Sequence, residues 1–353
     1  MSKTMDPNHT ALLRARGYTV HRELGSGRTA RVWLAAKILP KSTRVRPDSH
    51  YSEQLVAIKI VSRAAKRNFK NEVSLLQEIL VVRQLHPVDT IALYIESFCS
   101  SGPDELQCIV TEALGTSLET FRCYFADYCL PLLTVKPIIR DILTALDFLH
   151  TKCNVTHTDI NFNNVLFTRM IDRKNFRTSP LTVKLIDFGQ AVSKGVGKGS
   201  IQPLFYRAPE VMIGADWDWH VDIWNVGCLV FELLTGCSLF RCQDTAHFED
   251  GIDQERDIIG CMVVRTGTGF QGRFLMSGQD KLVVHFFTCP GLESGDYNFV
   301  PRATWTEVNT IDGELASYLQ GDHEPSSTLI QAMVRLNPNE RPTARELLAS
   351  QWF

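Results

Sequence analysis

The 353-residue chain lacks the features that mark secreted, membrane-spanning and nucleic-acid-binding proteins. Its first residues include no apolar signal-peptide core, and apolar runs such as 282–287 are far too short to cross a membrane. A net charge of −2 gives no general attraction to nucleic acid or anionic lipid. We therefore expect a cytoplasmic or nuclear protein that binds neither nucleic acid nor membranes.

The sequence also lacks CxxC pairs, internal repeats and low-complexity segments. Its ten cysteines are scattered, and Cys108, Cys228 and Cys261 lie inside apolar runs, where a thiol packs as a small hydrophobe. This spacing favours reduced, structural cysteines. The 44% hydrophobic and 22% charged composition is that of a soluble globular protein. The length suits two lobes or two modest domains.

The chain is organised around residues 155–167, VTHTDINFNNVLF. An apolar lead-in and an apolar exit flank a polar loop that holds Asp159 and Asn164. Phosphoryl transfer needs such a pair, since the acid can accept the proton of an attacking hydroxyl while the amide holds a metal on the phosphates. Taken alone, this spacing also fits an ordinary surface turn.

A glycine-bearing hairpin and a lysine-bearing strand lie upstream. Residues 18–24 and 31–36 alternate in polarity around Gly25 and Gly27, where the absence of a Cβ lets main-chain N–H groups approach phosphate oxygens. After a polar loop, the β-branched strand 55–61 carries Lys59 at its centre. A lysine is costly there unless it is paired or faces a ligand.

A helix is predicted over residues 63–85, with Glu78 inside it, 19 residues after Lys59 (78 − 59). We expect Glu78 to pair with Lys59. Glu72 is the alternative, and at 13 residues (72 − 59) it lies early in the helix.

Downstream, residues 91–98 and 106–112 read as strands, and residues 133–150 read as a long buried helix. The strand 181–186 ends in Asp187-Phe188-Gly189, where a carboxylate can bind a hard cation such as Mg²⁺. Residues 221–236 are apolar almost throughout and predict a buried central helix. Asp222 near its start is expected to accept hydrogen bonds from the backbone of the polar loop that holds Asp159.

These motifs occur in the order found in protein kinases. GSGRTARV at 25–32, VAIK at 56–59, HTDINFNN at 157–164, DFG at 187–189, APE at 208–210 and DIW at 222–224 resemble the family's motifs. The resemblance implies an α+β, bilobal fold with a small five-stranded antiparallel lobe carrying one helix, and a larger helical lobe. It places the small lobe and hinge at 18–115 and the large lobe at 116–353, with no further domain. Residues 1–17 are polar and show no clear periodicity, so we expect a flexible or loosely docked lead-in there.

The resemblance also implies roles for individual residues. Asp159, Asn164, Lys59 and Glu78 would be catalytic, and Asn164 and Asp187 would hold Mg²⁺. Arg341 would form a buried, structural pair with Glu210. ATP would contact residues of the glycine hairpin, the neighbouring strands, the hinge and the DFG motif: Leu24, Gly25, Ser26, Gly27, Val32, Ala57, Lys59, Thr111, Glu112, Leu114 and Asp187.

Finer features resemble the SR protein kinases, which phosphorylate serines in Arg/Ser-rich splicing factors. LHTKC at 149–153, HTDI at 157–160, IQ at 201–202 and the segment 276–292 carry this resemblance. It implies an Arg/Ser-rich protein substrate, a role in mRNA processing and a monomer. The acidic run 249–257, with five carboxylates, is expected to dock arginines; the alternative is a solvated loop.

Three residues depart from the kinase pattern. Thr158 replaces an arginine that binds an activation-loop phosphate, so activity should not depend on one. Asn161 replaces the lysine that neutralises the transferring phosphoryl group, and Pro203 replaces its threonine partner. The rate should therefore be reduced, unless Lys194 or Lys198 supplies the charge.

Two functions remain open on this basis. We favour a Mg-ATP-dependent serine/threonine protein kinase, because all metal and phosphate ligands are present. The alternative is an ATP-binding pseudokinase that acts as a scaffold or regulatory partner. A small-molecule kinase of related fold fits less well, because the APE segment builds a platform for peptides.

Overall fold

The computed structural model describes residues 5–27, 29–38, 53–62, 65–100, 106–193, 195–241, 251–288, 298–299, 309–319, 321 and 323–353. It divides into two compact units, Met1–Gly115 (unit 1) and Thr116–Phe353 (unit 2), and each is described by itself. None of the helices in the described residues is both long enough and apolar enough to cross a membrane.

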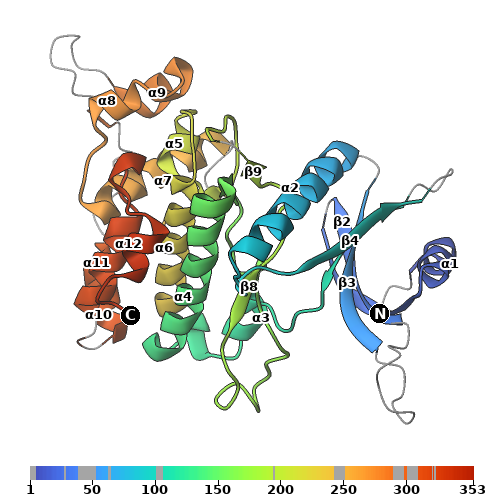
Figure 1. Ribbon diagram of the computed structural model, residues 1–353. Helices are drawn as coiled ribbons and strands as arrows, with labels where there is room; N and C mark the ends of the chain where they lie inside the picture. Colours follow the sequence, from blue (N-terminus) through green and yellow to red (C-terminus); the bar gives the residue numbers. More distant parts are fainter. Residues whose placement is uncertain are drawn as a thin grey trace. The chain divides into compact units, whose positions relative to one another are not determined.

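Unit 1 is built on a five-stranded antiparallel sheet with strand order β1-β2-β3-β5-β4 (Figure 1). The strands are β1 (Tyr18–Ser26), β2 (Ala30–Ile38), β3 (Glu53–Val61), β4 (Tyr94–Cys99) and β5 (Gln107–Glu112). Helix α2 (Lys66–Leu85) connects β3 to β4. The predicted small lobe of five strands and one long helix is therefore confirmed.

The two faces of this sheet have different neighbours, because successive side chains of a strand point to opposite faces. One face contributes Val56, Ile58, Cys108 and Val110 to a buried cluster that also contains Leu13. On the other face, strand register places Val32 opposite Lys59, and Ala57 opposite Thr111. Four of the predicted nucleotide-binding residues thus share one face: Val32, Ala57, Lys59 and Thr111.

The lead-in before β1, expected from the sequence to be flexible or loosely docked, is largely helical in its described residues, 5–17. It contains helix α1 (Pro7–Ala15), which has Pro7 at its first turn and Asp6 as N-cap, accepting a hydrogen bond from Asn8 N–H at 2.8 Å. Leu13 is fully buried against the sheet, and the Arg16 guanidinium lies 4.2 Å from the Phe98 ring centroid. The expectation fails because a nine-residue helix with one buried leucine leaves almost no periodic signal.

Unit 2 is mainly helical, and its described residues contain three short antiparallel strand pairs. The pairs are β6 (Val155–Thr156) with β9 (Val192–Ser193), β7 (Val165–Phe167) with β8 (Val183–Leu185), and β10 (Phe287–Thr288) with β11 (Asn298–Phe299). The α-helices are α3 (Leu118–Arg122), α4 (Leu132–Phe148), α5 (Pro209–Met212), α6 (His220–Thr235), α7 (Gly251–Thr266), α8 (Gly272–Leu275), α9 (Asp280–Phe286), α10 (Ile311–Leu319), α11 (His323–Met333) and α12 (Ala344–Leu348).

Helix α6 forms the centre of unit 2, as its apolar sequence predicts (Figure 1). A Cβ on Gly227 would lie 2.7 Å from Val334 Cγ1 and 2.9 Å from Met333 Cβ. The glycine therefore allows the end of α11 to approach α6 closely. Gly236, with φ of 70°, ends the helix in the left-handed conformation that favours glycine.

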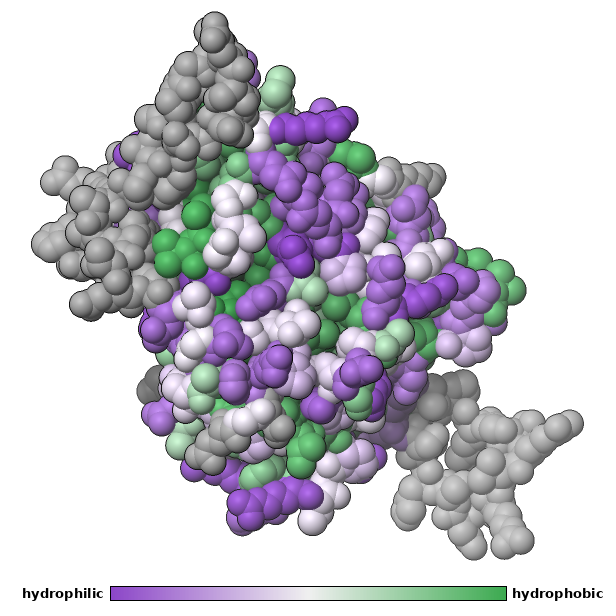
Figure 2. All heavy atoms as spheres, turned by 90° about the vertical axis from the view of Figure 1, so that its left-hand side faces the viewer, coloured by the Kyte–Doolittle hydropathy of each residue, from purple (hydrophilic) through white to green (hydrophobic). Residues whose placement is uncertain are grey.

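The described cysteines are thiols rather than disulfides. None of the eight cysteines in the described residues forms a disulfide, and the prediction that Cys108, Cys228 and Cys261 are buried is confirmed. Burial raises the pKa of Cys108 to about 12, so this side chain is a neutral thiol at physiological pH. Figure 2 shows one face of the molecule, on which small hydrophobic areas are interspersed among hydrophilic side chains, an ordinary protein surface.

Candidate active site

Lys59 and Glu72 form an ion pair in unit 1. Lys59 Nζ lies 2.7 Å from Oε1 and 2.9 Å from Oε2 of Glu72, which is on α2. The Glu72 side chain is only 5% exposed, so salt screens the pair weakly. Glu72 thus fixes an ammonium group on the sheet face that also carries Val32 and Ala57.

The sequence-based choice of Glu78 as the partner of Lys59 is wrong. Glu78 is exposed. It follows Glu72 by six residues (78 − 72), which rotates a side chain about 240° around a helix. The number of residues from Lys59 does not show on which side of the helix a glutamate lies. Glu72, the alternative kept open from the sequence, is the partner.

The glycine hairpin lies where β1 meets β2. Gly25 pairs with Val32, and Gly27 N–H donates to the Ala30 carbonyl at 2.8 Å. Among the described residues, a Cβ on Gly25 would meet no heavy atom within 4 Å, and one on Gly27 would come no closer than 3.9 Å to any. Packing does not require glycine at either position. The open space above the backbone suits the close approach of a phosphate, and Leu24 and Ser26 beside it are exposed.

The end of β5 carries the residues predicted to contact adenine. Thr111 is half-buried opposite Ala57. Glu112 turns toward Leu93, donating its N–H to the Leu93 carbonyl at 3.0 Å and accepting the Leu93 N–H at 2.7 Å through Oε1. The N–H of Leu114 donates to none of the described residues. Of the backbone N–H groups of Glu112 and Leu114, that of Leu114 is therefore the one available to a ligand.

In unit 2, Asp222 holds the backbone of the catalytic loop, residues 157–164. Its buried carboxylate accepts the N–H groups of His157 and Thr158, each at 2.8 Å, and lies 2.9 Å from His150 Nε2. Thr158 has φ of 69°, a strained conformation that costs on the order of 1–3 kcal/mol. These bonds stabilise it. The predicted structural role of Asp222 is confirmed.

Two further bonds connect the catalytic loop to the strand and turn that carry Asp187. The ring of the fully buried His157 places Nε2 3.0 Å from the Ile186 carbonyl and lies 5.1 Å from the Phe188 ring. Thr158 Oγ1 donates to the Gln190 carbonyl at 3.0 Å. Thr158, which stands where an arginine is common, therefore bonds directly to the residue that follows the DFG motif.

Asp159 is half-buried, and each of its carboxylate oxygens accepts an amide hydrogen bond. Asn161 Nδ2 donates to Oδ1 and Asn164 Nδ2 donates to Oδ2, both at 2.8 Å. Asn164 Nδ2 also donates to the Asp159 carbonyl at 2.9 Å. The carboxylate is thus held in one orientation by neutral donors, and the free lone pairs of its oxygens remain for a substrate hydroxyl.

The residues predicted to hold a metal offer oxygen ligands. Asp187 is exposed, has φ of 64° and accepts the Gly189 N–H at 3.2 Å. Because the amide nitrogen of Asn164 donates to Asp159, its side-chain oxygen is the atom left to bind a cation. One carboxylate and one amide oxygen suit Mg²⁺ if phosphate oxygens complete the shell. No group of three or more His, Cys, Asp or Glu ligands occurs among the described residues.

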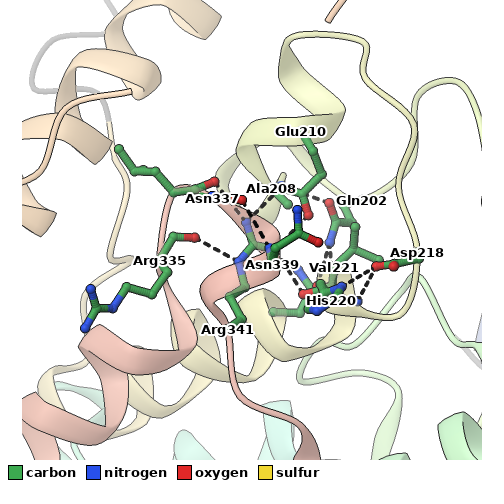
Figure 3. Close-up of polar contacts among 12 residues, drawn as sticks. Gln202, Ala208, Glu210, Asp218, His220, Val221, Arg335, Asn337, Asn339 and Arg341 are labelled. Carbon is green, nitrogen blue, oxygen red and sulfur yellow. Dashed lines mark hydrogen bonds and ion pairs between the residues drawn. The ribbon is translucent and has the colours of Figure 1, made fainter. Parts of the chain in front are cut away.

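The activation segment, residues 187–210, is tied to α6 by Gln202. This residue has φ of 65°, and its side-chain amide donates to Val221 O at 3.0 Å and to Asn225 Oδ1 at 2.9 Å. Gln202 Oε1 accepts the Ala208 N–H at 2.9 Å (Figure 3). The sequence identified Gln202 only as part of a family pattern. Its anchoring role was missed, because a strained backbone angle leaves no signal in a single sequence.

Trp217 holds the glycine-rich part of the activation segment. It exchanges two backbone hydrogen bonds with Gly197, at 2.6 and 3.1 Å, and its Nε1 donates to the Gly199 carbonyl at 3.0 Å. Lys198 pairs with Asp216 at 3.0 Å and is 79% exposed. Lys194, the other basic residue considered for the missing lysine, lies outside the described residues.

Arg341 and Glu210 form the predicted buried pair. The two guanidinium Nη atoms lie 2.6 and 2.7 Å from the Glu210 oxygens, and both side chains are at most 1% exposed. Arg341 also donates to the carbonyls of Arg335 and His220, at 2.8 and 3.0 Å (Figure 3). Its guanidinium carbon also lies 4.9 Å from the centroid of the Trp224 ring. The end of the activation segment is thus fixed to α6 and to the segment before α12.

The acidic run 249–257 does not form a uniform exposed surface. Glu255 accepts a hydrogen bond from Arg207 Nη1 at 2.7 Å, and Asp257 is 8% exposed. Glu249, Asp250 and the side chain of Asp253 lie outside the described residues. Two of the five carboxylates are therefore already placed within the fold, one of them on an arginine of the activation segment.

The comparisons with known proteins agree with this geometry. The protein kinase domain model matches residues 18–353. A serine/threonine protein kinase of Aspergillus fumigatus is 29% identical over 95% of this chain and 84% of its own length. The serine/threonine-protein kinase SRPK of Physarum polycephalum is 26% identical over 94% and 84%, respectively.

A serine/threonine-protein kinase of Arabidopsis thaliana is 34% identical over a shorter part, 39% of this chain and 38% of its own length. The family model covers nearly the whole chain. The five-stranded sheet of unit 1, the catalytic loop and the helices of unit 2 also occur in the order that the motifs predict. The chain belongs to the protein kinase domain family, as a divergent eukaryotic member with relatives among the SR protein kinases.

Proposed function

We propose that this protein is a Mg-ATP-dependent serine/threonine protein kinase. The observation that carries the proposal is the Asp159 carboxylate, oriented through both oxygens by Asn161 and Asn164. A carboxylate held in this way can accept the proton of a serine or threonine hydroxyl as the oxygen attacks the γ-phosphoryl group. Catalysis then consists mainly of positioning and charge neutralisation.

The remaining residues have roles in binding. Lys59, held by Glu72, would contact the α- and β-phosphates, and the backbone at Gly25 and Gly27 would cover the phosphates. Asn164 and Asp187 would hold Mg²⁺, which supplies positive charge and polarises the phosphoryl oxygens. Leu114 N–H would bind adenine.

We further propose that phosphoryl transfer is slow. Asn161 supplies a neutral amide where most kinases of this class have an ammonium, and the amide already donates to Asp159. Loss of a charge directed at the transition state costs on the order of 10²-fold in rate. The same observation favours a second candidate, an ATP-binding pseudokinase in which the assembled site binds nucleotide without useful transfer.

The proposed substrates are proteins with arginine-flanked serines. Support comes from the SR protein kinase resemblance, from the name of the Physarum relative and from the acidic run. Since Glu255 is bonded to Arg207 and Asp257 is buried, docking would depend on Glu249, Asp250 and Asp253. Charge reversal at Glu249 and Asp253 should raise KM for an Arg/Ser peptide, while reversal at exposed Asp312 should not.

The decisive experiment is transfer of ³²P from ATP to an Arg/Ser peptide, compared between the wild-type protein and Asp159→Asn. We expect incorporation by the wild-type protein and its loss in the variant. Thermal shifts with Mg-ATP measure nucleotide binding separately. Equal incorporation by both proteins would refute the enzymatic proposal, and binding without transfer would identify the pseudokinase.

A further inference from the structure

Arg122 of α3 lies between two carboxylates from different parts of unit 2. Its Nε is 2.7 Å from Oε2 of Glu119, one helical turn earlier, and its Nη1 is 2.9 Å from Oε1 of Glu232 on α6. The side chains of Arg122 and Glu232 are 16% and 12% exposed, whereas Glu119 is 39% exposed. The guanidinium therefore contacts the less exposed Glu232 on one side and the more exposed Glu119 on the other.

Aromatic rings complete the enclosure. The Arg122 guanidinium carbon lies 4.3 Å from the Phe162 ring centroid and 5.3 Å from that of Tyr128. Tyr206 donates its hydroxyl to the second oxygen of Glu232 at 2.7 Å and packs edge-on against Phe162. Two carboxylates and an aromatic face are the groups that bind a guanidinium best, through paired hydrogen bonds and cation–π attraction.

This arrangement belongs to the part of unit 2 that must meet a substrate. Phe162 is in the catalytic loop, three residues after Asp159, and Tyr206 is in the activation segment, two residues before Ala208. A hydroxyl that reaches Asp159 brings its neighbouring residues toward these side chains. Glu119 and Glu232 would therefore lie within reach of a substrate residue close to the phosphoacceptor.

We propose that Arg122 is a specificity-determining residue. Its guanidinium occupies a subsite that would otherwise bind a basic substrate residue near the phosphoacceptor. This proposal rests on the proposed protein kinase function and specifies its substrates. A substrate arginine gains less from Glu119 and Glu232 while Arg122 occupies the space between them and offsets one of their two negative charges. Any strong preference for arginine must then come from other carboxylates, such as those of the acidic run 249–257.

Burial alone would lower the pKa of Arg122, but its hydrogen bonds and charge contacts with Glu119 and Glu232 outweigh this effect and raise the pKa. Burial and the Glu232 charge raise the pKa of Tyr206 well above its ordinary value, so the phenol stays a neutral donor. Arg122 therefore stays charged and Tyr206 stays a hydrogen-bond donor at physiological pH, and a basic substrate side chain would have to displace the Arg122 guanidinium to take its hydrogen bonds.

The test is a peptide scan with purified full-length protein. A neutral serine peptide and a series with one arginine moved through each position near the serine are phosphorylated by the wild-type protein and by Arg122→Leu. The readout is the ratio of kcat/KM for each arginine peptide to that for the neutral peptide. At one position, this ratio should rise about tenfold in Arg122→Leu, the value of one charge-assisted contact.

Matched variants locate the effect. Arg122→Leu with Glu232→Gln should abolish the gain, and Arg122→Lys, which keeps a charge, should show little. Arg173→Leu removes a nearby exposed arginine that contacts Cys123 O and the Tyr124 ring, and its ratios should equal those of the wild type. If the leucine variant does not fold, Arg122→Gln replaces it.

Ratios that stay equal to those of the wild type in Arg122→Leu, with normal phosphorylation of the neutral peptide, would overturn the role of Arg122 alone. If no protein phosphorylates any peptide, the proposed kinase activity fails instead. In that case, fluorescence anisotropy of the same peptides decides the inference. Tighter binding of one arginine peptide by Arg122→Leu supports it, and unchanged dissociation constants refute it.

Discussion

Asn161 donates a 2.8 Å hydrogen bond from its amide nitrogen to Oδ1 of Asp159, the proposed catalytic base. The amide orients the carboxylate, but it brings no positive charge to the phosphoryl group. In most serine/threonine kinases of the resembled pattern, one lysine both orients the catalytic carboxylate and neutralises the phosphoryl group. In this protein, Asn161 provides only the orientation.

The first prediction is that Asn161→Lys raises kcat by roughly tenfold or more and leaves ATP affinity nearly unchanged, because the charge matters most in the transition state. Pro203→Thr should add an orienting hydroxyl, so the double variant should exceed the sum of the single effects. Steady-state kinetics at saturating Mg-ATP measure both. If kcat rises in neither Asn161 variant, the missing-cation explanation is wrong; Lys194→Ala and Lys198→Ala would then identify another source of charge.

A second prediction compares two glutamates of one helix. Glu72→Gln should lower kcat/KM for ATP roughly tenfold or more, because Lys59 loses the charge that orients it. Glu78→Gln makes the same chemical change on the exposed side of α2 and should leave kcat/KM within about twofold. A larger loss in Glu78→Gln than in Glu72→Gln would contradict the observed pairing.

How much of this site the sequence predicts depends on the kind of information involved. Motif order gave the catalytic loop, Asp187 and the pair of Arg341 with Glu210, because these residues have fixed spacing or a fixed chemical partner. Glu72 was ranked below Glu78, because only the rotation of the helix distinguishes them. Gln202 and Arg122 were missed, because their roles depend on contacts with residues distant in sequence.

The fold follows the same division. Alternating polarity and β-branched residues predict the strands of unit 1, and apolar content predicts α6. Helix α1 was mistaken for a flexible lead-in, since its stability comes from the tertiary contact of Leu13 rather than from a repeated pattern.

The third prediction concerns the contact between Gly197 and Trp217. A Cβ on Gly197 would lie 2.2 Å from the Trp217 ring, so Gly197→Ala should displace the activation segment and destabilise the fold by about 1–3 kcal/mol. Denaturant unfolding measures the free energy of unfolding. Gly269→Ala is the control, because its Cβ would meet nothing within 4 Å. Adding Trp217→Leu should recover part of the loss; equal stability of the two glycine variants would disprove the clash.

The fourth prediction tests the buried pair against an exposed one. Arg341→Met leaves the Glu210 carboxylate buried without its partner and should destabilise the protein by about 3–5 kcal/mol. Arg345→Met removes a pair with Asp147 in which the arginine is 64% exposed, and should cost about 0–1 kcal/mol. Thermal unfolding of both variants gives the comparison, and similar losses would mean that Arg341 is replaceable.

The fifth prediction is a pH dependence in unit 1. Hydrogen bonds from Lys37 and Tyr18 hold the pKa of Glu96 below its ordinary value of 4.5, despite partial burial. A lowered folded-state pKa adds stability that is complete above the unfolded-state pKa and is lost as pH falls through the folded-state pKa. The melting temperature should therefore fall less between pH 7 and pH 3 in Glu96→Gln than in the wild type. Glu78→Gln is the control, and a wild-type-like fall in Glu96→Gln would argue against the linkage.

The pair of Glu210 with Arg341 joins residues 131 positions apart. During synthesis from the N-terminus, Glu210 leaves the ribosome long before its partner exists, and a carboxylate without a partner resists burial. The activation segment therefore cannot adopt its final position until residue 341 has been made. A nascent chain that already holds every proposed nucleotide ligand would still lack a finished platform for peptides, so competence to bind ATP should arise before competence to bind substrate.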